Sequence, residues 1–355
     1  GTLSVNLPPY TSTSWYRHIH FDVGTQTLFV LQEDKVTRVN MTTNTYEQWD
    51  TQRYSGGHYA LGACFDPVSE MLYHTGFGHL MQTSLYANGA HSKNGGPLIG
   101  SVYLPYNEKG MTGAYMHCDV EQRMMYVMGE EGRRLYSMPF PSTGTQTLNL
   151  YGVPLGAATP PPSGAGYYGM AWADSTHTSI YAIDPSLKAV VQLFPSNPTS
   201  NLVLDTGSFA FIDPRDLIVD YNSTTTNPLG TLYVTDYASR AIIRIEIGHP
   251  TSAAPINTGS YQFDSPSGIA IDSMRGYLYA IDWGNHQIVR IPLSAPSETS
   301  IVNHGSDQFD SLIALTIDVE ANILYLLNSQ SRIYAMQLPN PIEIHEIERA
   351  NSDII

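Results

Sequence analysis

An aspartate that is followed seven positions later by an aromatic residue recurs along the whole chain. Six such pairs occur: Asp22 with Phe29, Asp66 with Tyr73, Asp119 with Tyr126, Asp174 with Tyr181, Asp272 with Tyr279, and Asp318 with Tyr325. A seventh pair, Asp220 with Tyr233, has the same flanks around an insertion. Successive aspartates are 44 to 55 residues apart, which is the period of a four-stranded propeller blade. The chain is therefore predicted to contain seven copies of one sheet.

The residues around each pair predict the strands of that sheet. An apolar run such as 217–219 indicates an inner strand, a polar turn follows the aspartate, and a second strand begins before the aromatic residue. A third run such as 242–247 and a variable outer segment complete the sheet. Such a sheet has two apolar faces, which neighbours packed around a ring would cover. The predicted fold class is all-β, a β-propeller of four-stranded blades, with seven blades expected and six as the alternative.

We expect a single propeller domain over residues 1–338. The predicted repeats lie near residues 18–41, 59–86, 115–140, 167–194, 214–247, 266–293 and 312–338. Residues 2–7 alternate in polarity and can supply a strand that closes the last blade, and so can the C-terminal extension 339–355. Because one closing strand is enough, 339–355 is predicted either to cap its own propeller or to be a strand-like tail or linker that pairs elsewhere.

The sixth copy carries a specific resemblance to a known family. Its sequence DWGNH at 282–286, preceded by GIAID at 268–272, resembles the NHL repeat, which is named for an Asn-His-Leu triplet. The fifth copy keeps this frame with SR at 239–240 in place of Asn-His. The chain is thus similar to NHL-repeat and YWTD-like propellers, most clearly over residues 214–293. The resemblance implies a propeller, often six-bladed in that family. In the NHL-like lyases it implies metal-bound imidazoles around the central mouth, and these do not map onto single residues here.

Charge and hydropathy exclude several classes of partner. The formal net charge is -15, with only 17 basic residues, and no run of Lys and Arg is long enough to follow a phosphate backbone. We therefore expect no nucleic-acid partner and no attraction to an anionic membrane. No apolar stretch approaches the length of a membrane span, so no membrane-crossing segment is expected either.

Sequence patterns favour an extracellular or cell-surface location. Asn40 and Asn222 each begin an N-linked glycosylation acceptor tripeptide, and Asn222 lies in a Thr- and Asn-rich insertion that predicts an exposed loop. The stretch TPPPS at 159–163 is of the kind that carries O-linked sugars in secreted proteins. The chain begins at Gly1, and we expect it to be a processed or trimmed product. N-linked and O-linked glycans are therefore predicted.

The repeated aspartates and aromatic residues are predicted to be structural. An Asp at the end of a strand commonly accepts hydrogen bonds from turn amides, and a Tyr or Phe at a fixed strand position commonly packs between sheets. Asn285 and His286 are expected to serve a turn in the same way. No catalytic residue is assigned, since the chain has no nucleophile elbow, phosphate-binding loop, His-Glu-x-x-His or Cys-x-x-Cys motif.

One layer of the predicted channel offers candidate metal ligands. His20, Cys64 and His117 each stand two residues before a repeat aspartate, which places them at the same height on three consecutive inner strands. Imidazole and thiolate are zinc ligands. The other members of the layer, mostly apolar, are Trp172, Ile218, Ala270 and Thr316, a composition that favours packing between blades instead. No cofactor is predicted, and a metal ion in the channel is retained as the minor alternative.

Two functions remain open at this point. The first is a non-catalytic interaction or structural module, glycosylated and placed outside the cell, that assembles with protein partners or with itself through residues 339–355. Repeated head-to-tail contacts of this kind would build a filament. The alternative is a propeller enzyme, a metal-assisted lyase or lactonase, with its site at the mouth of the central channel.

Overall fold

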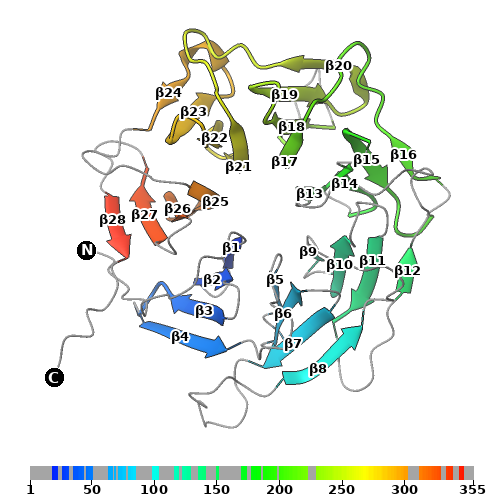
Figure 1. The fold of residues 1–355 in the computed structure, drawn as a ribbon, viewed down its shortest axis with the longest axis vertical. Coiled ribbons are helices and arrows are strands. Elements are labelled where there is room, and N and C mark those ends of the chain that lie inside the picture. Colours follow the sequence, from blue (N-terminus) through cyan, green and yellow to red (C-terminus); the bar gives the residue numbers. More distant parts are fainter. Residues whose placement is uncertain are drawn as a thin grey trace.

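A computed structural model shows the chain arranged as a ring of sheets (Figure 1). The structure describes residues 18–22, 26–31, 35–43, 45–50, 63–66, 68, 71–76, 79–84, 98–103, 116–119, 122–128, 135–140, 149–151, 169–173, 177–184, 187–197, 200–222, 229–302, 312–328, 333–338 and 344–347. Within these ranges the chain is almost entirely β-strand, and one short 3-10 helix, η3 (Pro296–Glu298), precedes an outer strand.

The described residues form seven four-stranded antiparallel sheets, here termed blades 1 to 7 in chain order. In each blade the strand order from the centre outward follows the sequence. The inner strands are β1 (His18–Asp22), β5 (Ala63–Asp66), β9 (Met116–Asp119), β13 (Met170–Trp172), β17 (Pro214–Asp220), β21 (Pro266–Asp272) and β25 (Leu312–Asp318). The second strands are β2 (Thr27–Leu31), β6 (Met71–Gly76), β10 (Met124–Met128), β14 (Ile180–Asp184), β18 (Thr231–Asp236), β22 (Tyr277–Asp282) and β26 (Ile323–Asn328).

The two outer positions of each blade complete the ladder. The third strands are β3 (Lys35–Asn40), β7 (His79–Ser84), β11 (Leu135–Pro139), β15 (Ala189–Leu193), β19 (Ala241–Glu246), β23 (Gln287–Pro292) and β27 (Ile333–Gln337). The outer strands are β4 (Thr45–Asp50), β8 (Leu98–Tyr103), β12 (Asn149–Tyr151), β16 (Leu202–Val203), β20 (His249–Pro255), β24 (Ser300–Ile301) and β28 (Ile344–Ile347). The variable segments between the sequence repeats thus supply the outer strands, as predicted.

Each inner strand contacts the inner strand of the next blade, and β25 of blade 7 contacts β1 of blade 1, so the ring closes. The predicted fold class, an all-β propeller of four-stranded blades, is confirmed. β28 lies within the predicted extension 339–355 and pairs with β27, so this segment provides the outer strand of its own last blade. Residues 2–7, the other candidate for a closing strand, lie outside the described residues.

The regular spacing between Asp and aromatic residue follows from the register of the first hairpin. In blade 6, Asp272 lies opposite Tyr277, so Ala270 lies opposite Tyr279, seven positions after the aspartate. The same register holds in blades 1, 2, 3 and 7. Blade 4 differs by one residue, because Ala171 and not Trp172 lies opposite Tyr181. Trp172 therefore does not belong to the layer in which the sequence spacing placed it.

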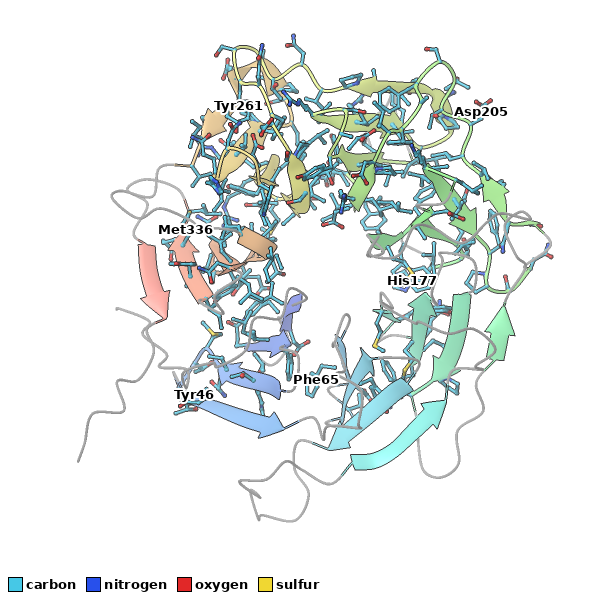
Figure 2. The ribbon with its side chains drawn as sticks, in the orientation of Figure 1. Tyr46, Phe65, His177, Asp205, Tyr261 and Met336 are labelled. Carbon is cyan, nitrogen blue, oxygen red and sulfur yellow. The ribbon has the colours of Figure 1, made fainter. Side chains whose placement is uncertain are left out.

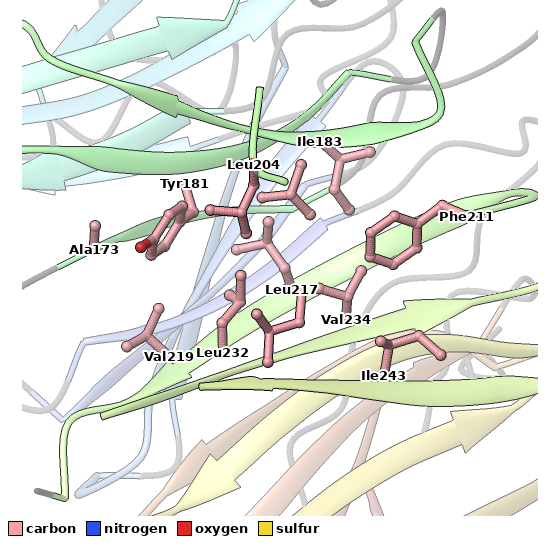
Figure 3. Packing of buried hydrophobic residues seen from close by; sticks show 12 residues of the cluster. Ala173, Tyr181, Ile183, Leu204, Phe211, Leu217, Val219, Leu232, Val234 and Ile243 are labelled. Atoms are coloured by element: carbon pink, nitrogen blue, oxygen red, sulfur yellow. The ribbon is translucent and has the colours of Figure 1, made fainter. Parts of the chain in front are cut away.

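The hydrophobic core lies between neighbouring blades. Figure 3 shows this packing between blades 4 and 5, where Tyr181 and Ile183 of β14 face Leu217 of β17 and Leu232 of β18. Leu232 is fully buried, and removing a side chain of this size from water stabilises a fold by about 1.5–3 kcal/mol. Because each blade covers its neighbour in this way, the ring depends on contacts far apart in sequence.

The strand order also gives the ring two different faces. The inner strands begin at one face, here called the entry face, and end at the other, the exit face. Turns between second and third strands, and loops that lead into inner strands, lie at the entry face. Turns after inner strands and turns before outer strands lie at the exit face. Any residue in a turn can therefore be assigned to one face from the topology alone.

Candidate functional site

The repeat aspartates lie at the exit face and cap turns. Oδ1 of Asp119, Asp272 and Asp318 accepts a hydrogen bond from the backbone N–H three residues later, at 2.8–3.0 Å. All three side chains are buried. The predicted structural role of these aspartates is therefore confirmed in the blades where the turn is described.

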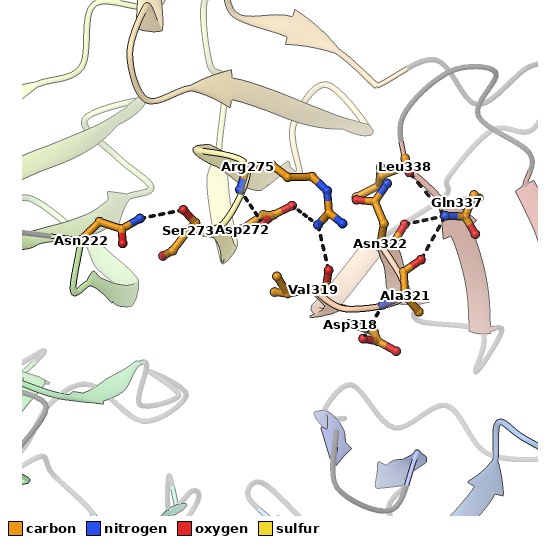
Figure 4. A network of polar contacts seen from close by, with 10 residues as sticks. All are labelled: Asn222, Asp272, Ser273, Arg275, Asp318, Val319, Ala321, Asn322, Gln337 and Leu338. Carbon is orange, nitrogen blue, oxygen red and sulfur yellow. Dashed lines mark hydrogen bonds and ion pairs between the residues drawn. The ribbon is translucent and has the colours of Figure 1, made fainter.

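Several of these aspartates also link one blade to the next, which the sequence did not indicate. Arg123 of blade 3 donates two hydrogen bonds to Asp66 of blade 2, at 2.9 and 2.6 Å. Nδ1 of His177 in blade 4, labelled in Figure 2, lies 2.8 Å from Oδ2 of Asp119 in blade 3. Figure 4 shows the corresponding region of blades 5 to 7, where Arg275 bonds its own Asp272 and the carbonyl of Val319 in the next blade. These contacts hold the blades together at the exit face.

The repeat aromatic residues pack between blades, as predicted. The rings of Phe29 and Phe65 have centroids 4.9 Å apart across blades 1 and 2, and Tyr126 meets Trp172 edge-on at 5.0 Å across blades 3 and 4. Burial raises the pKa of Tyr279 to about 12, so this ring remains neutral in the interior. These residues are part of the core and do not form a site.

The candidate metal ligands occupy equivalent backbone positions. His20 lies opposite Phe29, Cys64 opposite Tyr73 and His117 opposite Tyr126, so the predicted common height on β1, β5 and β9 is correct for the backbone. Their side chains lie outside the described residues, and the metal site stays a prediction. Among the side chains that are described, no group of three or more His, Cys, Asp or Glu is arranged to hold a metal ion.

Both predicted N-glycosylation acceptors lie at the exit face. Asn40 ends β3, and its Oδ1 accepts hydrogen bonds from the backbone N–H of Thr42 and Thr43 at 3.0 and 2.9 Å, bonds that do not involve Nδ2, the atom that would carry a glycan. Asn222 is exposed and follows β17. Its Nδ2 donates a hydrogen bond to the carbonyl of Ser273 at 2.6 Å. The proline-rich stretch 159–163, expected to carry O-linked sugars, lies outside the described residues.

The entry face of blades 5 and 6 carries the candidate interaction surface, here called the Trp283 patch. The patch consists of Asp213, Arg215, Tyr237, Arg240, Asp264 and Trp283. Tyr237 directly follows β18 and Trp283 directly follows β22, so the two rings occupy the same position in adjacent blades. Their ring centroids are 6.3 Å apart, and 41% of the Trp283 surface is exposed. The patch thus presents an aromatic pair to solvent on a rigid part of the fold.

Two buried carboxylates fix the backbone of this patch. Asp236 accepts hydrogen bonds from the backbone N–H of Ile212 and Asp213, both at 2.8 Å, and so ties the loop before β17 to the turn after β18. Asp282 binds the loop before β21 in the same way, through the N–H groups of residues 264 and 265. It also accepts hydrogen bonds from Asn285 at 2.7 Å and from the hydroxyl of Tyr261 at 2.7 Å (Figure 2). The predicted turn role of Asn285 is therefore confirmed.

The charged members of the patch are paired with one another. Arg215 lies over the ring of Tyr237, with its Cζ 4.8 Å from the ring centroid, and its Nη2 is 2.6 Å from Oδ2 of Asp213. Arg240 of blade 5 reaches Asp264 in the loop of blade 6, with Nη2 and Oδ1 3.3 Å apart. The patch therefore has no net charge, and its chemistry combines aromatic rings with ion pairs.

Another carboxylate, that of Asp216, lies next to Arg215 in the sequence and has an unusual pKa. Asp216 stands near the start of β17, where its Oδ1 accepts a hydrogen bond from the N–H of Leu217 at 2.9 Å and its Oδ2 accepts one from Ile269 of β21 at 3.1 Å. Burial raises the pKa of Asp216 to about 7, even though these two hydrogen bonds favour the charged form. Asp216 thus joins two inner strands and changes protonation near neutral pH.

Comparison with known proteins shows the fold class. No protein-family model matches the chain, and no curated protein matches it in sequence. Among solved structures, virginiamycin B lyase from Staphylococcus aureus is similar, with a TM-score of 0.66, 11% sequence identity, and coverage of 94% of this chain and 98% of that one. The Cps50 (Swd1) β-propeller domain of Myceliophteria thermophila has a TM-score of 0.60 at 10% identity, with 93% and 98% of the two chains covered.

A third similar structure comes from a nidogen/laminin complex, with a TM-score of 0.50, 15% identity, and coverage of 88% of this chain and 89% of that one. The protein is therefore a β-propeller, and it resembles propellers of the NHL and YWTD kinds. At this level of identity the likeness concerns the fold. The solved neighbours include interaction domains and a lyase, and the described residues of this chain contain no helix long and apolar enough to cross a membrane.

Proposed function

We propose that this propeller is a non-catalytic interaction module that works outside the cell and contacts its partner through the Trp283 patch. The observation that supports the interaction most strongly is the fixed aromatic pair of the exposed Trp283 and the partly exposed Tyr237 beside Arg240. Trp, Tyr and Arg are the residues that most often dominate the binding energy of protein interfaces. Here the two loops are already ordered by Asp236 and Asp282, so little conformational entropy is lost on binding.

The two faces of the ring support a division of roles. Asn40 and Asn222 both lie at the exit face, whereas the Trp283 patch lies at the entry face. Glycans on these asparagines would cover the exit face and leave the patch accessible. This arrangement suits a glycosylated component of an extracellular assembly.

Comparison of two variants in the natural assembly tests the interaction. Trp283→Ala combined with Tyr237→Ala is expected to reduce incorporation of the protein at least tenfold, because the aromatic anchors are lost. Met274→Ala, which removes an exposed side chain at the exit face, serves as the matched control and is expected to incorporate normally. Equal incorporation of both variants would contradict the proposal.

Mass spectrometry of the natural protein tests the location. We expect glycan-bearing peptides at Asn40 and Asn222, and a mass increase at each asparagine after enzymatic release of the glycan in heavy-oxygen water. Unmodified peptides at both positions would remove the support for an extracellular role, while leaving the patch itself untouched.

Assembly through residues 339–355 is a further part of the proposal, and the structure narrows how it would occur. β28 uses one edge to pair with β27 and is the last strand of its blade. A neighbouring molecule would therefore have to add to the outer edge of β28, and repeated addition would give a filament.

The enzyme alternative is supported only by likeness of fold to a lyase, and metal analysis of the purified protein tests whether His20, Cys64 and His117 bind an ion.

A further inference from the structure

Blades 5 and 6 have the same backbone pairing at the entry face, so their residues can be compared position by position. Pro214 lies opposite Asp236 in blade 5, and Pro266 lies opposite Asp282 in blade 6. Both inner strands then have a bulge before the register resumes. The equivalent pairs, with the blade 5 residue first, are Asp213 with Ser265, Arg215 with Ser267, Asp216 with Gly268, Tyr237 with Trp283, and Arg240 with His286.

In blade 5 this arrangement binds the guanidinium group of Arg215. Arg215 stacks on the ring of Tyr237 at 4.8 Å and forms an ion pair with Asp213 at 2.6 Å. Stacking of a cation on an aromatic face, combined with a carboxylate partner, is a favourable environment for arginine. Blade 5 therefore shows, within the same molecule, how this scaffold binds a guanidinium.

Blade 6 has the same backbone arrangement without a cation at the position of Arg215, and Ser265 replaces Asp213. Trp283, whose ring attracts cations more strongly than that of Tyr, takes the place of Tyr237. Ser267 takes the place of Arg215, and its hydroxyl oxygen is buried and has no hydrogen-bond partner among the residues that the structure describes. Such an unpartnered buried oxygen is uncommon in folded proteins and calls for a ligand or a water. A carboxylate is supplied by Asp264 instead, whose Oδ1 pairs with Arg240 at 3.3 Å and whose Oδ2 lies where a Cβ on Gly284 would be.

We infer that blade 6 binds an arginine side chain from a partner polypeptide, with the guanidinium stacked on Trp283 and paired with Asp264. The inference rests on the proposed interaction function and names the group that the patch recognises. The net charge of -15 attracts a cationic segment and opposes an anionic one. Exposed side chains beside the site, Ile212 at 51% and Arg240 at 68%, offer further contact to the residues that flank the arginine, which favours a polypeptide over a free small molecule.

A titration of the isolated full chain tests the inference. The probe is acetyl-Gly-Arg-Gly-amide, and the readouts are the NMR signals of the Trp283 indole N–H and the Gly284 amide. We expect both signals to move in a saturable way in the millimolar range, because one cation on an aromatic ring binds weakly. The same peptide with Glu in place of Arg is expected to leave both signals unchanged. Equal shifts with both peptides, or no shift with either, would overturn the inference.

The variant Ser267→Arg adds a sharper control, since it supplies in blade 6 the side chain that Arg215 supplies in blade 5. We expect it to abolish the peptide-induced shift of the Trp283 signal. Met274→Arg adds the same charge at the exit face and is expected to leave the shift unchanged. If Ser267→Arg does not fold, Trp283→Leu replaces it, and loss of the Gly284 shift is then expected. A Gly284 shift retained in the folded variant would place the peptide elsewhere and overturn the inference.

The titration and the incorporation test can fail independently, so failure of the arginine site can be told apart from failure of the proposed function. A failed titration with reduced incorporation of the Trp283 and Tyr237 double variant would show that the patch binds a partner without using arginine. A successful titration with normal incorporation would show the arginine site and refute the patch as the contact in the natural assembly.

Discussion

Arg123 shows how a single side chain can hold two blades together. Its guanidinium makes two hydrogen bonds to Asp66, a carboxylate that is fully buried. Arg123→Ala would remove the cation that pairs with this buried charge, so we expect the free energy of unfolding to fall by about 2–3 kcal/mol in urea denaturation. Arg244→Ala, which breaks the exposed pair with Glu246, is the matched control and should cost no more than about 1 kcal/mol. Equal losses of stability in the two variants would show that the contact between Arg123 and Asp66 contributes no more than an exposed ion pair.

Asp216 makes the stability of the fold depend on pH. Its pKa is raised to about 7 in the folded state, so the folded chain retains a proton that the unfolded chain releases above about pH 4. The stability contributed by this group is therefore full at acidic pH and is lost as pH rises through 7. Because Asn does not titrate, we expect the unfolding free energy of the natural protein minus that of Asp216→Asn to fall between pH 5 and pH 8. Parallel pH profiles for the two proteins would contradict the assignment.

For single residues, the sequence predicted structural roles but not the contacts between blades. The turn role of Asn285 was predictable, because it follows Asp282 within one short turn. The contact between Arg123 and Asp66 was not, because the residues are 57 positions apart and belong to different repeats. The Trp283 patch was also missed. Aligning the fifth and sixth repeats at Pro214 and Pro266 would have revealed the change from Arg215 to Ser267 before an exposed Trp.

The junction between blades 7 and 1 differs from that between blades 2 and 3. Asp318 is fully buried, and its Oδ2 has no hydrogen-bond partner among the described residues. The position that Arg123 occupies in blade 3 corresponds to Gln26 in blade 1. Both directly precede a second strand and have a left-handed backbone, with φ of 56° and 51°.

Gln26→Arg is therefore expected to reach Asp318 as Arg123 reaches Asp66. We predict that this change raises the free energy of unfolding by about 1 kcal/mol, because a buried acceptor gains a charged donor. The same substitution in an Asp318→Asn background should give no gain in urea denaturation. A gain of similar size in both backgrounds would indicate another cause.

β28 is the element that completes the last blade. It pairs with β27, whose Ile333 and Met336 are fully buried. A chain that ends at Leu338 would expose the edge of β27, so we expect it to be less stable and to associate through that edge, as seen by light scattering. A monomeric shortened chain of unchanged stability would show that β28 contributes nothing to the ring.

Strands were predicted correctly where the local sequence pattern determines them. The Asp and aromatic pairs fixed the first hairpins because the turn length sets the register. Blade 4 departed by one residue because its turn places a left-handed residue, His177, three positions after Asp174 instead of four. Which terminus supplies the last outer strand depended on pairing between distant segments, so residues 2–7 and 339–355 were equivalent candidates in sequence.

The whole molecule is a ring whose two faces differ in chemistry. The exit face carries the turn aspartates, the links between blades, and the predicted glycosylation acceptors Asn40 and Asn222. The entry face carries the Trp283 patch, where loops are fixed by buried carboxylates. In a propeller each face gathers residues from every blade, so a small difference between equivalent positions, such as Arg215 and Ser267, is enough to create a distinct surface.

Hydroxyl-radical footprinting of the natural protein, free and in the proposed assembly, tests whether the Trp283 patch contacts the partner. We expect Trp283 and Tyr237 to be oxidised in the free protein and protected at least several-fold in the assembly, whereas the exposed Met274 at the exit face is oxidised equally in both. Protection of Met274 with continued oxidation of Trp283 would show that the partner binds the opposite face and would refute the patch as the contact.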